Sequence, residues 1–454
     1  MSLDAGVASI GRARARLGLG LTVAAVVALL ALLGSSVASA APLPPRQPSS
    51  GLAGVPAAAV RVVSRALGRD DPRGLDPIAQ PTQLTATDGA AFDGLGYSVA
   101  ASGDTLVVGA VNATVGANSG QGAVYVFTGH GSHWTQEAKL TAADGAQGDQ
   151  LGSSVAISHG AIIAGAPGAT VGANIAQGAA YVFTHDGSHW TQEAKLTAPD
   201  GNANDQLGFS VAASGDTVVA GALDAASGDN PGLGAVYVFT GHGSRWSQEA
   251  ELTSAAGDPD DGQLGFAVAI SGDRLIAGAP EANDYQGDAY VFARRGGSWY
   301  EAARLTSPDS ADSLFGVSVA ISGKAAAVGT RYSANGQGAV YAFAHANSGW
   351  TEQAKLTAAD GVADDGFGAS LAMSHTSLVV GAPLATVNGN ASQGAAYVFS
   401  RGSSGWTQRA KLTAPGELGD SVAVSDGTIV VGASAATVNG NAEQGAAYLY
   451  QLRP

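Results

Sequence analysis

The chain of 454 residues contains no cysteine. This absence excludes disulfide bonds, thiol nucleophiles and cysteine-ligated zinc sites, so the folded state depends on packing. Basic residues are also scarce, because 22 Lys and Arg stand against 37 Asp and Glu and give a formal net charge of −15. A surface of this charge repels phosphate groups, and we therefore expect neither a nucleic acid nor an anionic membrane as a partner.

Sequence motifs for catalysis are missing as well. The chain has no Gly-x-Ser-x-Gly nucleophile elbow and no glycine-rich phosphate loop followed by a helix. Glycine, in contrast, is abundant, and its 65 residues follow no collagen period. Such a composition indicates short strands joined by tight turns.

The N-terminal residues differ from the rest of the chain. Three arginines precede an apolar run at residues 17–33 and an Ala-x-Ala exit at 38–40. This order predicts a signal peptide at 1–40, cleaved after Ala40. An uncleaved signal anchor is the alternative, because the apolar run approaches the length that spans a bilayer. Residues 41–77 are rich in Pro and Ala and predict a disordered linker.

Beyond the linker, the sequence repeats. Six tryptophans are separated by 56, 56, 53, 51 and 56 residues. They are Trp134, Trp190, Trp246, Trp299, Trp350 and Trp406. Each belongs to a longer unit that is most regular from Lys139 to Ala194, and a fixed period of this length predicts a repeat architecture.

Each unit contains four predicted strands, and helical patterning is essentially absent. In the second unit the strands are Ser154–Ser158, Ile162–Ala166, Ala179–Phe183 and Trp190–Ala198, bounded by Gly, Asp or Ser. The third is apolar on both faces, as expected between neighbouring sheets, and the fourth carries the charges of a protected outer edge. Strict alternation along the fourth strand predicts one face made of Trp190, Gln192, Ala194 and Leu196.

The number of units is seven. A tyrosine of the third strand recurs at Tyr125, Tyr181, Tyr237, Tyr290, Tyr341, Tyr397 and Tyr448. The seventh unit has no fourth strand of its own, whereas Gln83–Ala86 matches Lys139–Ala142. We therefore predict an all-β fold at residues 78–454, a seven-bladed β-propeller of four-stranded blades whose ring is closed by an N-terminal strand.

Two short motifs recur in register with the strands. Phe-Gly is present at Phe315–Gly316 and Phe367–Gly368, and as Leu-Gly in the other five units. Gly-Ala-Pro is present at Gly165–Pro167, Gly278–Pro280 and Gly381–Pro383. With these motifs the units resemble FG-GAP repeats of the short bacterial type, and through them the N-terminal propeller of the integrin alpha subunit. The resemblance implies a ligand-binding role at the cell exterior.

The resemblance does not extend to calcium. Calcium-binding repeats of this family carry Asp-x-Asp-x-Asp-Gly between the first two strands, because a hard cation needs several closely spaced oxygen ligands. Here the corresponding turns are short, as in Ser102–Asp104 and Ser158–Gly160, and they lack these carboxylates. We expect no cofactor, and calcium binding has no support from the usual motif.

Acidic residues gather instead in the loops that cross from one blade to the next. The candidate residues of a ligand-binding face are Asp88, Asp93, Asp144, Asp149, Asp200, Asp205, Asp260, Asp261, Asp309, Asp312, Asp360, Asp364 and Asp365. Together with amide-rich loops such as Thr170–Asn174, they predict a polar ring at the channel mouth that would take a cation or a basic ligand. The alternative is that each Asp caps the backbone of its own turn.

Two further groups of polar residues stand out. His130 and His133, like His185 and His189, flank turns, and we interpret them as solvated turn residues because no third zinc ligand recurs with them. The residues that depart most from the repeat, and where an asymmetric site would lie, are Glu281, Asp284, Tyr285, Lys324, Arg331 and Tyr332.

These observations predict an exported, non-enzymatic binding or adhesion module, secreted or at the cell surface, for an extracellular protein or glycan. We expect a monomer with no membrane contact beyond an uncleaved anchor. One alternative is a secreted carbohydrate-active hydrolase or lyase that uses two carboxyl groups of the acidic face as acid and base. The other is a purely structural cell-surface protein.

Overall fold

The computed structural model describes residues 81–226, 232–254, 262–308, 313–333 and 336–452. The predicted signal peptide (1–40) and linker (41–77) lie outside these residues. Within the described part of the chain, no helix is both long and apolar enough to cross a membrane. Among the described residues, one short helical turn, α3 (Ala282–Tyr285), interrupts an otherwise all-β structure.

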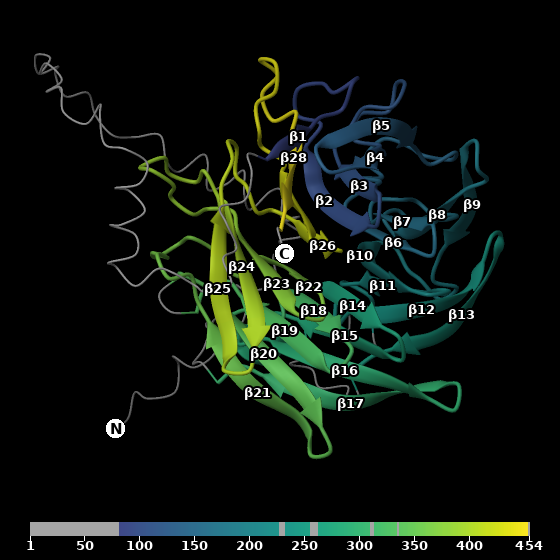
Figure 1. Cartoon of the computed structure of the whole chain (residues 1–454). Helices are drawn as coiled ribbons and strands as arrows, with labels where there is room; N and C mark the ends of the chain where they lie inside the picture. The colour runs from purple at the N-terminus through teal and green to yellow at the C-terminus, as the bar shows by residue number, and fades with distance from the viewer. Residues whose placement is uncertain (1–80, 227–231, 255–261, 309–312, 334–335, 453–454) are drawn as a thin grey trace, which may run out of the picture. The chain divides into compact units, whose positions relative to one another are not determined.

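Seven four-stranded antiparallel sheets form the blades of a ring (Figure 1). In each of the first six blades, four consecutive strands lie in chain order from the inner to the outer edge. Blades 1 to 3 consist of β2 (Leu95–Ser102), β3 (Thr105–Ala110), β4 (Ala123–His130), β5 (His133–Leu140); β6 (Val155–Ser158), β7 (Ala161–Ala166), β8 (Ala179–His185), β9 (Trp190–Leu196); and β10 (Leu207–Ser214), β11 (Thr217–Ala222), β12 (Ala235–His242), β13 (Arg245–Leu252). Blades 4 to 6 consist of β14 (Ala267–Ser271), β15 (Arg274–Ala279), β16 (Asp288–Arg295), β17 (Ser298–Thr306); β18 (Ser318–Ser322), β19 (Ala325–Thr330), β20 (Ala339–Ala346), β21 (Gly349–Leu356); and β22 (Ser370–Met373), β23 (Ser377–Ala382), β24 (Ala395–Gly402), β25 (Gly405–Leu412).

The seventh blade is built from both ends of the repeat region. Its three inner strands are β26 (Val422–Ser425), β27 (Thr428–Ala433) and β28 (Ala446–Gln451), and its outer strand is β1 (Thr82–Leu84). The pairing is antiparallel, with Gln83 opposite Tyr448, and Figure 1 shows β1 beside β28. The predicted fold, the count of seven blades and the closure by an N-terminal strand are confirmed.

Each pair of neighbouring blades buries its own hydrophobic cluster. Between blades 1 and 2, Tyr181 and Phe183 of β8 pack with Val124, Val126 and Leu140 of the preceding blade. The third strands have apolar side chains on both faces because each is covered by a blade on either side. The ring therefore has no single core but seven equivalent ones, and it needs closure to cover all of them.

The two sequence motifs meet at one contact between inner strands. An ideal Cβ placed on Gly165, of Gly-Ala-Pro, would lie 1.9 Å from the carbonyl oxygen of Gly208, of the next Leu-Gly. In several blades a serine reinforces this contact, as where Ser98 Oγ donates to the carbonyl oxygen of Gly152 (2.7 Å). The glycines are required because the backbones approach too closely for any side chain.

Strict alternation along the outer strand is wrong, because each of the six complete outer strands contains a β-bulge. In blade 2, Val182 pairs with Ala194 and Phe183 with Gln192, so Glu193 has no partner. The extra residue reverses the alternation. Trp190 therefore packs toward blade 1, whereas Ala194 packs toward blade 3.

Candidate functional site

The propeller has two faces of different construction. One, the loop face, carries the crossing loops between blades and the loops between second and third strands. These two sets of loops are hydrogen-bonded to each other, as where Asn174 Nδ2 donates to the Gly201 carbonyl (2.8 Å) and Gln177 Nε2 to the Ala198 carbonyl (2.8 Å). The prediction that they share one face is confirmed. The opposite face, the hairpin face, carries the remaining turns.

The Asn-x-x-Gln arrangement holds the loop face together. Its Asn side chain also donates to its own Gln, and the pair recurs in four blades. The four pairs are Asn118 and Gln121, Asn174 and Gln177, Asn390 and Gln393, and Asn441 and Gln444. The last pair crosses the closure of the ring, since Asn441 Nδ2 donates to the Gly89 carbonyl (3.4 Å). The loop face is thus a connected, preorganised surface.

In the described crossing loops before blades 1, 2, 3 and 6, the first aspartate is bound by the following blade. Asp144 accepts hydrogen bonds from Tyr181 Oη (3.0 Å) and Lys195 Nζ (2.7 Å). Burial would raise the pKa of Asp144, but the hydrogen bonds from Lys195 and Tyr181 outweigh it and hold the pKa below its usual value. Asp88 and Asp360 have the same lysine contact.

The second aspartate caps its own loop. Asp93, Asp149, Asp205 and Asp365 are only 4–7% exposed. Each accepts a hydrogen bond from the backbone N–H three residues earlier, as Asp149 does from Ala146 (2.8 Å). These contacts are those that the turn-capping interpretation predicts, and a ligand bound by this face stays a prediction.

Of the remaining predicted acidic residues, some lie in the described part of the chain and others outside it. Asp364 is exposed on its crossing loop. Asp260, Asp261, Asp309 and Asp312 lie outside the described residues. In the described part of the chain, no group of three or more His, Asp and Glu is arranged to hold a metal ion.

The pattern of the carboxylates changes at blades 3 and 4. Glu251 stands where blades 1, 2, 5 and 6 have a lysine, and burial together with the charge of Asp200 raises its pKa. Burial also raises the pKa of Asp224, to which Asp205 adds repulsion, and that of Glu281, to which Asp224 adds repulsion. This side of the loop face therefore carries carboxyl groups that ionise with difficulty.

Two matched substitutions should change stability in opposite directions. Asp144→Asn removes a group whose folded pKa is depressed, so it should destabilise the chain at pH 7, by less than about 1 kcal/mol because half the side chain is exposed. That contribution is present above the unfolded pKa and is lost as the pH falls through the folded value. Asp224→Asn removes a group whose folded pKa is raised, so it should stabilise the chain at pH 7.

Thermal melting of both variants at pH 7 and at about pH 3 checks this prediction. The stabilisation that protonated Asp224 provides is present below its unfolded pKa and is lost as the pH rises through its folded value. The advantage of Asp224→Asn should therefore disappear in acid. Destabilisation of equal size by both variants at pH 7 would contradict it.

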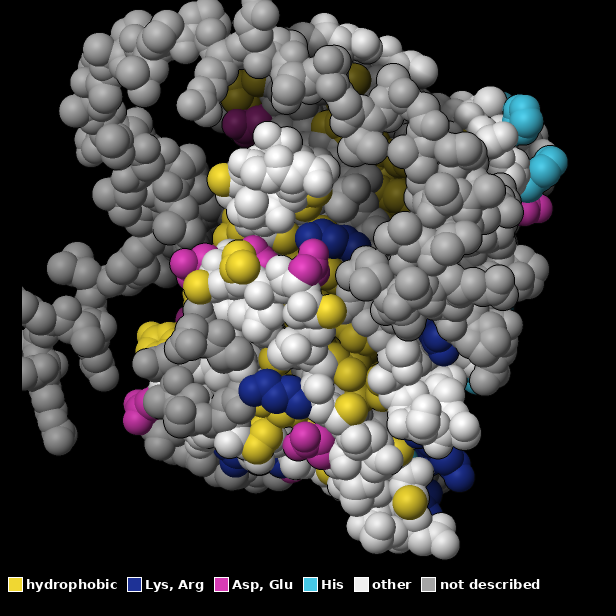
Figure 2. Space-filling view, turned by 60° about the vertical axis from the view of Figure 1, so that its left-hand side comes forward, with side chains coloured by type: hydrophobic (Ala, Val, Ile, Leu, Met, Phe, Trp, Pro, Cys, Tyr) yellow, Lys and Arg dark blue, Asp and Glu magenta, His cyan; other side chains and the backbone are white. Residues whose placement is uncertain are grey.

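Exposed apolar side chains also concentrate on the loop face. Six large hydrophobic side chains are exposed in the described residues, and five belong to loops of this face. The five are Phe92 (59%), Ile175 (69%), Tyr285 (53%), Tyr332 (47%) and Val362 (56%). Figure 2 shows exposed hydrophobic side chains interspersed with Asp and Glu on one side of the molecule. The sequence pattern did not reveal this set, whose only signal is an apolar residue at the centre of a polar turn.

Two of these residues have an unfavourable backbone conformation. Phe92 has φ +70° and Tyr285 has φ +67°, in the left-handed region that bulky residues avoid. Such a conformation costs on the order of 1–3 kcal/mol and is concentrated at functional sites. At Phe92 this backbone conformation is held by a hydrogen bond that its N–H donates to the Ala442 carbonyl (2.9 Å).

The residues that depart from the repeat do not form one site. Glu281, Tyr285, Arg331 and Tyr332 belong to loops of the loop face, whereas Lys324 lies in a turn of the hairpin face. Arg331 lies over the ring of Tyr332, 6.0 Å from its centroid.

All eight histidines of the chain lie in turns or strand ends of the hairpin face, and Figure 2 shows histidines together at one edge. His130 and His133 are exposed at the adjoining ends of β4 and β5, and His189 is exposed in a turn. His185 differs, because its Nε2 lies 3.3 Å from Glu137 Oε1 of the preceding blade. The spacing of the histidines did not predict that contact.

Comparison with protein families supports the architecture. A model of the FG-GAP repeat matches seven segments, residues 79–127, 134–183, 190–239, 246–292, 299–343, 350–399 and 406–450. Each segment begins near the outer strand of one blade and ends on the third strand of the next. A search of curated proteins finds no significant match. Because the matched segments cover most of the sequence and all seven blades, the chain belongs to the FG-GAP repeat family.

Proposed function

We propose that the chain is an exported, non-enzymatic binding module that presents its loop face to an extracellular protein or glycan. The observation that carries this proposal is the concentration of exposed apolar side chains on that face. The five side chains lie in loops of different blades on this one face, and a mixture of apolar and polar residues is typical of interaction surfaces. Aromatic residues such as Phe92 and Tyr285 are the side chains that contribute most to binding energy at such surfaces.

The loops that carry these side chains are held in place before a partner arrives. Ile175 follows directly after Asn174, whose side chain is bonded to the neighbouring loop, and its own carbonyl accepts from Asn204 N–H (2.9 Å). Tyr285 similarly accepts a hydrogen bond from Leu314 N–H (3.1 Å). A surface that is already ordered loses little conformational entropy on binding.

The chemistry of this face also indicates what it binds. Exposed carboxylates such as Asp364 lie in the same loops as the exposed apolar side chains, so a partner that offers both basic and apolar groups is electrostatically complementary. The chain's net charge of −15 adds a long-range attraction for such a partner. We expect salt to slow the association more than it weakens the final complex.

A binding screen tests the proposal. The exported chain is tested on an array of purified glycans and a panel of extracellular proteins, with and without calcium. The substitution of Phe92, Ile175 and Tyr285 by Ser should weaken the binding that is found by about a hundredfold or more, because each anchor contributes on the order of 1–2 kcal/mol. The matched control is Tyr300→Ser, which removes an equally exposed tyrosine (48%) from the outer strand β17.

Retention of binding by the triple variant, or equal loss in Tyr300→Ser, would contradict the assignment of the loop face. Absence of binding to any glycan or protein would favour a structural role. Calcium dependence would show that the acidic loops hold a cation.

A further inference from the structure

An open groove lies between blades 1 and 2 on the hairpin face. Its volume is about 470 Å³, within the range of small-molecule sites. Its lining includes Thr128, Glu137, Ile157, Thr184, His185 and Trp190. His159 also lines it, so the groove combines one carboxylate, hydroxyl groups, one indole and two imidazole rings in a space of the size of a sugar ring and its substituents.

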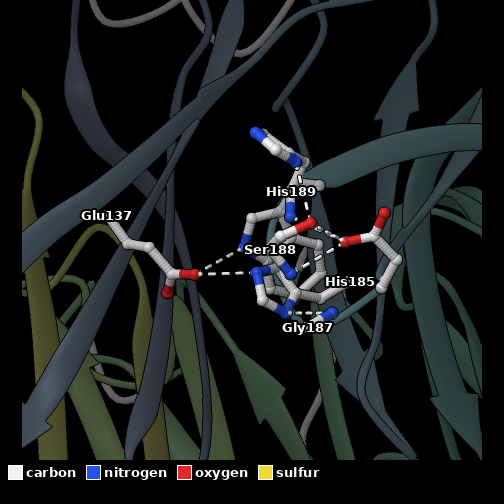
Figure 3. A network of polar contacts seen from close by, with 7 residues as sticks. Glu137, His185, Gly187, Ser188 and His189 are labelled. Atoms are coloured by element: carbon white, nitrogen blue, oxygen red, sulfur yellow. Dashed lines mark hydrogen bonds and ion pairs between the residues drawn. The ribbon is translucent and has the colours of Figure 1, made fainter.

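The β-bulges explain how these side chains meet. In β5, Glu137 is the residue without a partner, since Phe127 pairs with Gln136 and Val126 with Ala138. A bulge re-aims the side chain of the extra residue. Glu137 thus reaches blade 2, where its Oε1 accepts a hydrogen bond from Trp190 Nε1 (3.2 Å) and lies 3.3 Å from His185 Nε2. Figure 3 shows Glu137 pointing at His185 across the interface.

The hairpin of blade 2 fixes the histidine. Gly187 N–H donates to His185 Nδ1 (3.2 Å), which leaves the imidazole proton on Nε2, where it donates to Glu137. Asp186 Oδ1 accepts from the N–H and Oγ of Ser188 and from His189 N–H, each at 2.8 Å. The rings of His185 and Trp190 are then 5.1 Å apart and inclined at 51°. These hydrogen bonds and the ring contact hold the side chains of the groove wall in fixed positions.

No other described blade combines a histidine, its opposite tryptophan and a bulge carboxylate of the preceding blade. Blade 5 repeats the ring pair, with His345 opposite Trp350 and the centroids 5.3 Å apart, but the bulge residue of blade 4 is Ala302.

Where blade 2 has His185, blades 1 and 3 have Gly129 and Gly241, each opposite its own tryptophan. The indole N–H groups of Trp134 and Trp246 donate to their own turns (3.1 and 2.8 Å) instead of to a neighbouring blade.

Blade 4 has an arginine at the same position. Arg294 Nε lies 2.9 Å from Glu249, the bulge residue of blade 3. An arginine–glutamate ion pair there takes the place of the His185–Glu137 contact. Among the described blades, the combination of Glu137, His185 and Trp190 therefore occurs only between blades 1 and 2.

We propose that this groove binds one residue of a neutral carbohydrate. A sugar offers hydroxyl groups that both donate and accept, which match the threonine hydroxyls and the free lone pairs of Glu137. Its C–H face matches the half-buried Trp190 ring. Glu137 would repel an acidic sugar, so neutral rings are preferred over uronates. This inference goes beyond the proposed function, because it assigns a second binding site, on the hairpin face, that does not depend on the loop face.

Calorimetric titration of the whole chain with neutral and acidic sugars tests the groove. The probes are glucose, galactose, mannose, N-acetylglucosamine, short neutral oligosaccharides, and glucuronate as the charged counterpart. We expect saturable binding of at least one neutral sugar, and weaker or no binding of glucuronate. Trp190→Ala and Glu137→Gln should each weaken this binding at least about tenfold. Trp246→Ala, a tryptophan of the same strand position in blade 3, is the matched control and should leave it unchanged.

The blade 4 arrangement supplies a second variant that keeps the fold. His185→Arg reproduces the Arg294–Glu249 pair, so it should retain the melting temperature of the parent chain while abolishing sugar binding. The loop-face triple variant should bind the sugar normally, which separates this inference from the proposed function. No saturable binding of any neutral sugar, binding that His185→Arg and Trp190→Ala both retain, or binding lost only in the loop-face variant would overturn it.

Discussion

Deleting residues 41–86 should lower the melting temperature of the chain far more than deleting residues 41–76. Only the longer deletion removes β1, which completes blade 7. Leu84 and Ala86 are 3% and 7% exposed and pack in the cluster between blades 7 and 1. Loss of one buried leucine alone costs about 2–5 kcal/mol. The deletion adds the loss of three residues of pairing with β28 and uncovers that strand as an edge open to aggregation.

The contacts that cross the closure without β1 remain in both truncations. Ser421 Oγ still donates to the Gly96 carbonyl (2.8 Å), so the difference between the truncations reports β1 and the residues beside it. Leu196→Ala is the matched control, because it removes the equivalent side chain (4% exposed) from a blade of continuous chain. We expect it to cost less than the longer deletion. Equal melting temperatures for the two truncations would show that β1 does not stabilise the ring.

The fold could be predicted because the repeat itself carries the information. The match of Gln83–Ala86 to Lys139–Ala142 identified the strand that closes the ring, and the structure pairs Gln83 with Tyr448. The tyrosine represented by Tyr181 recurs at the same position in every unit. Its burial in one blade therefore predicts its burial in all seven. Repetition makes prediction easy where the units agree.

The orientation of the outer strand could not be predicted in the same way. Each bulge adds one residue, as Glu193 does in blade 2, and alternation then fails beyond it. The error placed Trp190 on the wrong side and concealed its contact with Glu137, which lies in another unit. A comparison of the units in register would have given one signal, since His185 replaces a glycine of blades 1 and 3.

The roles of the aspartates in the crossing loops could not be predicted from the sequence, for a different reason. Asp144 and Asp149 occur at similar sites in one loop, yet the first is bound by Tyr181 and Lys195 of the following blade and the second by its own backbone. Sequence alone does not separate these roles, because both are aspartates of an Asp-rich turn. The exposed Phe92 is equally hidden in the sequence, since its exposure follows from a positive φ.

Gly165→Ala should destabilise the propeller by about 3 kcal/mol or more, because the new methyl group would lie 1.9 Å from the backbone oxygen of Gly208. A flexible side chain could move away, whereas a carbonyl oxygen of the neighbouring inner strand moves only if the two blades separate. Gly402→Ala is the matched control, since its nearest atom is 3.9 Å away and its backbone is not left-handed. We expect that variant to stay within about 0.5 kcal/mol of the parent chain. Urea unfolding of both variants measures the difference.

The same contact recurs at the closure of the ring, which makes it a test of the whole architecture. A Cβ on Gly432 of blade 7 would lie 1.9 Å from the carbonyl oxygen of Gly96 in blade 1. If the ring is closed as tightly there as elsewhere, Gly432→Ala should cost as much as Gly165→Ala. A tolerated Gly432→Ala beside a damaging Gly165→Ala would mean that blades 7 and 1 separate easily. The glycine contact would then be essential between blades 2 and 3 and dispensable where the ring closes, between blades 7 and 1.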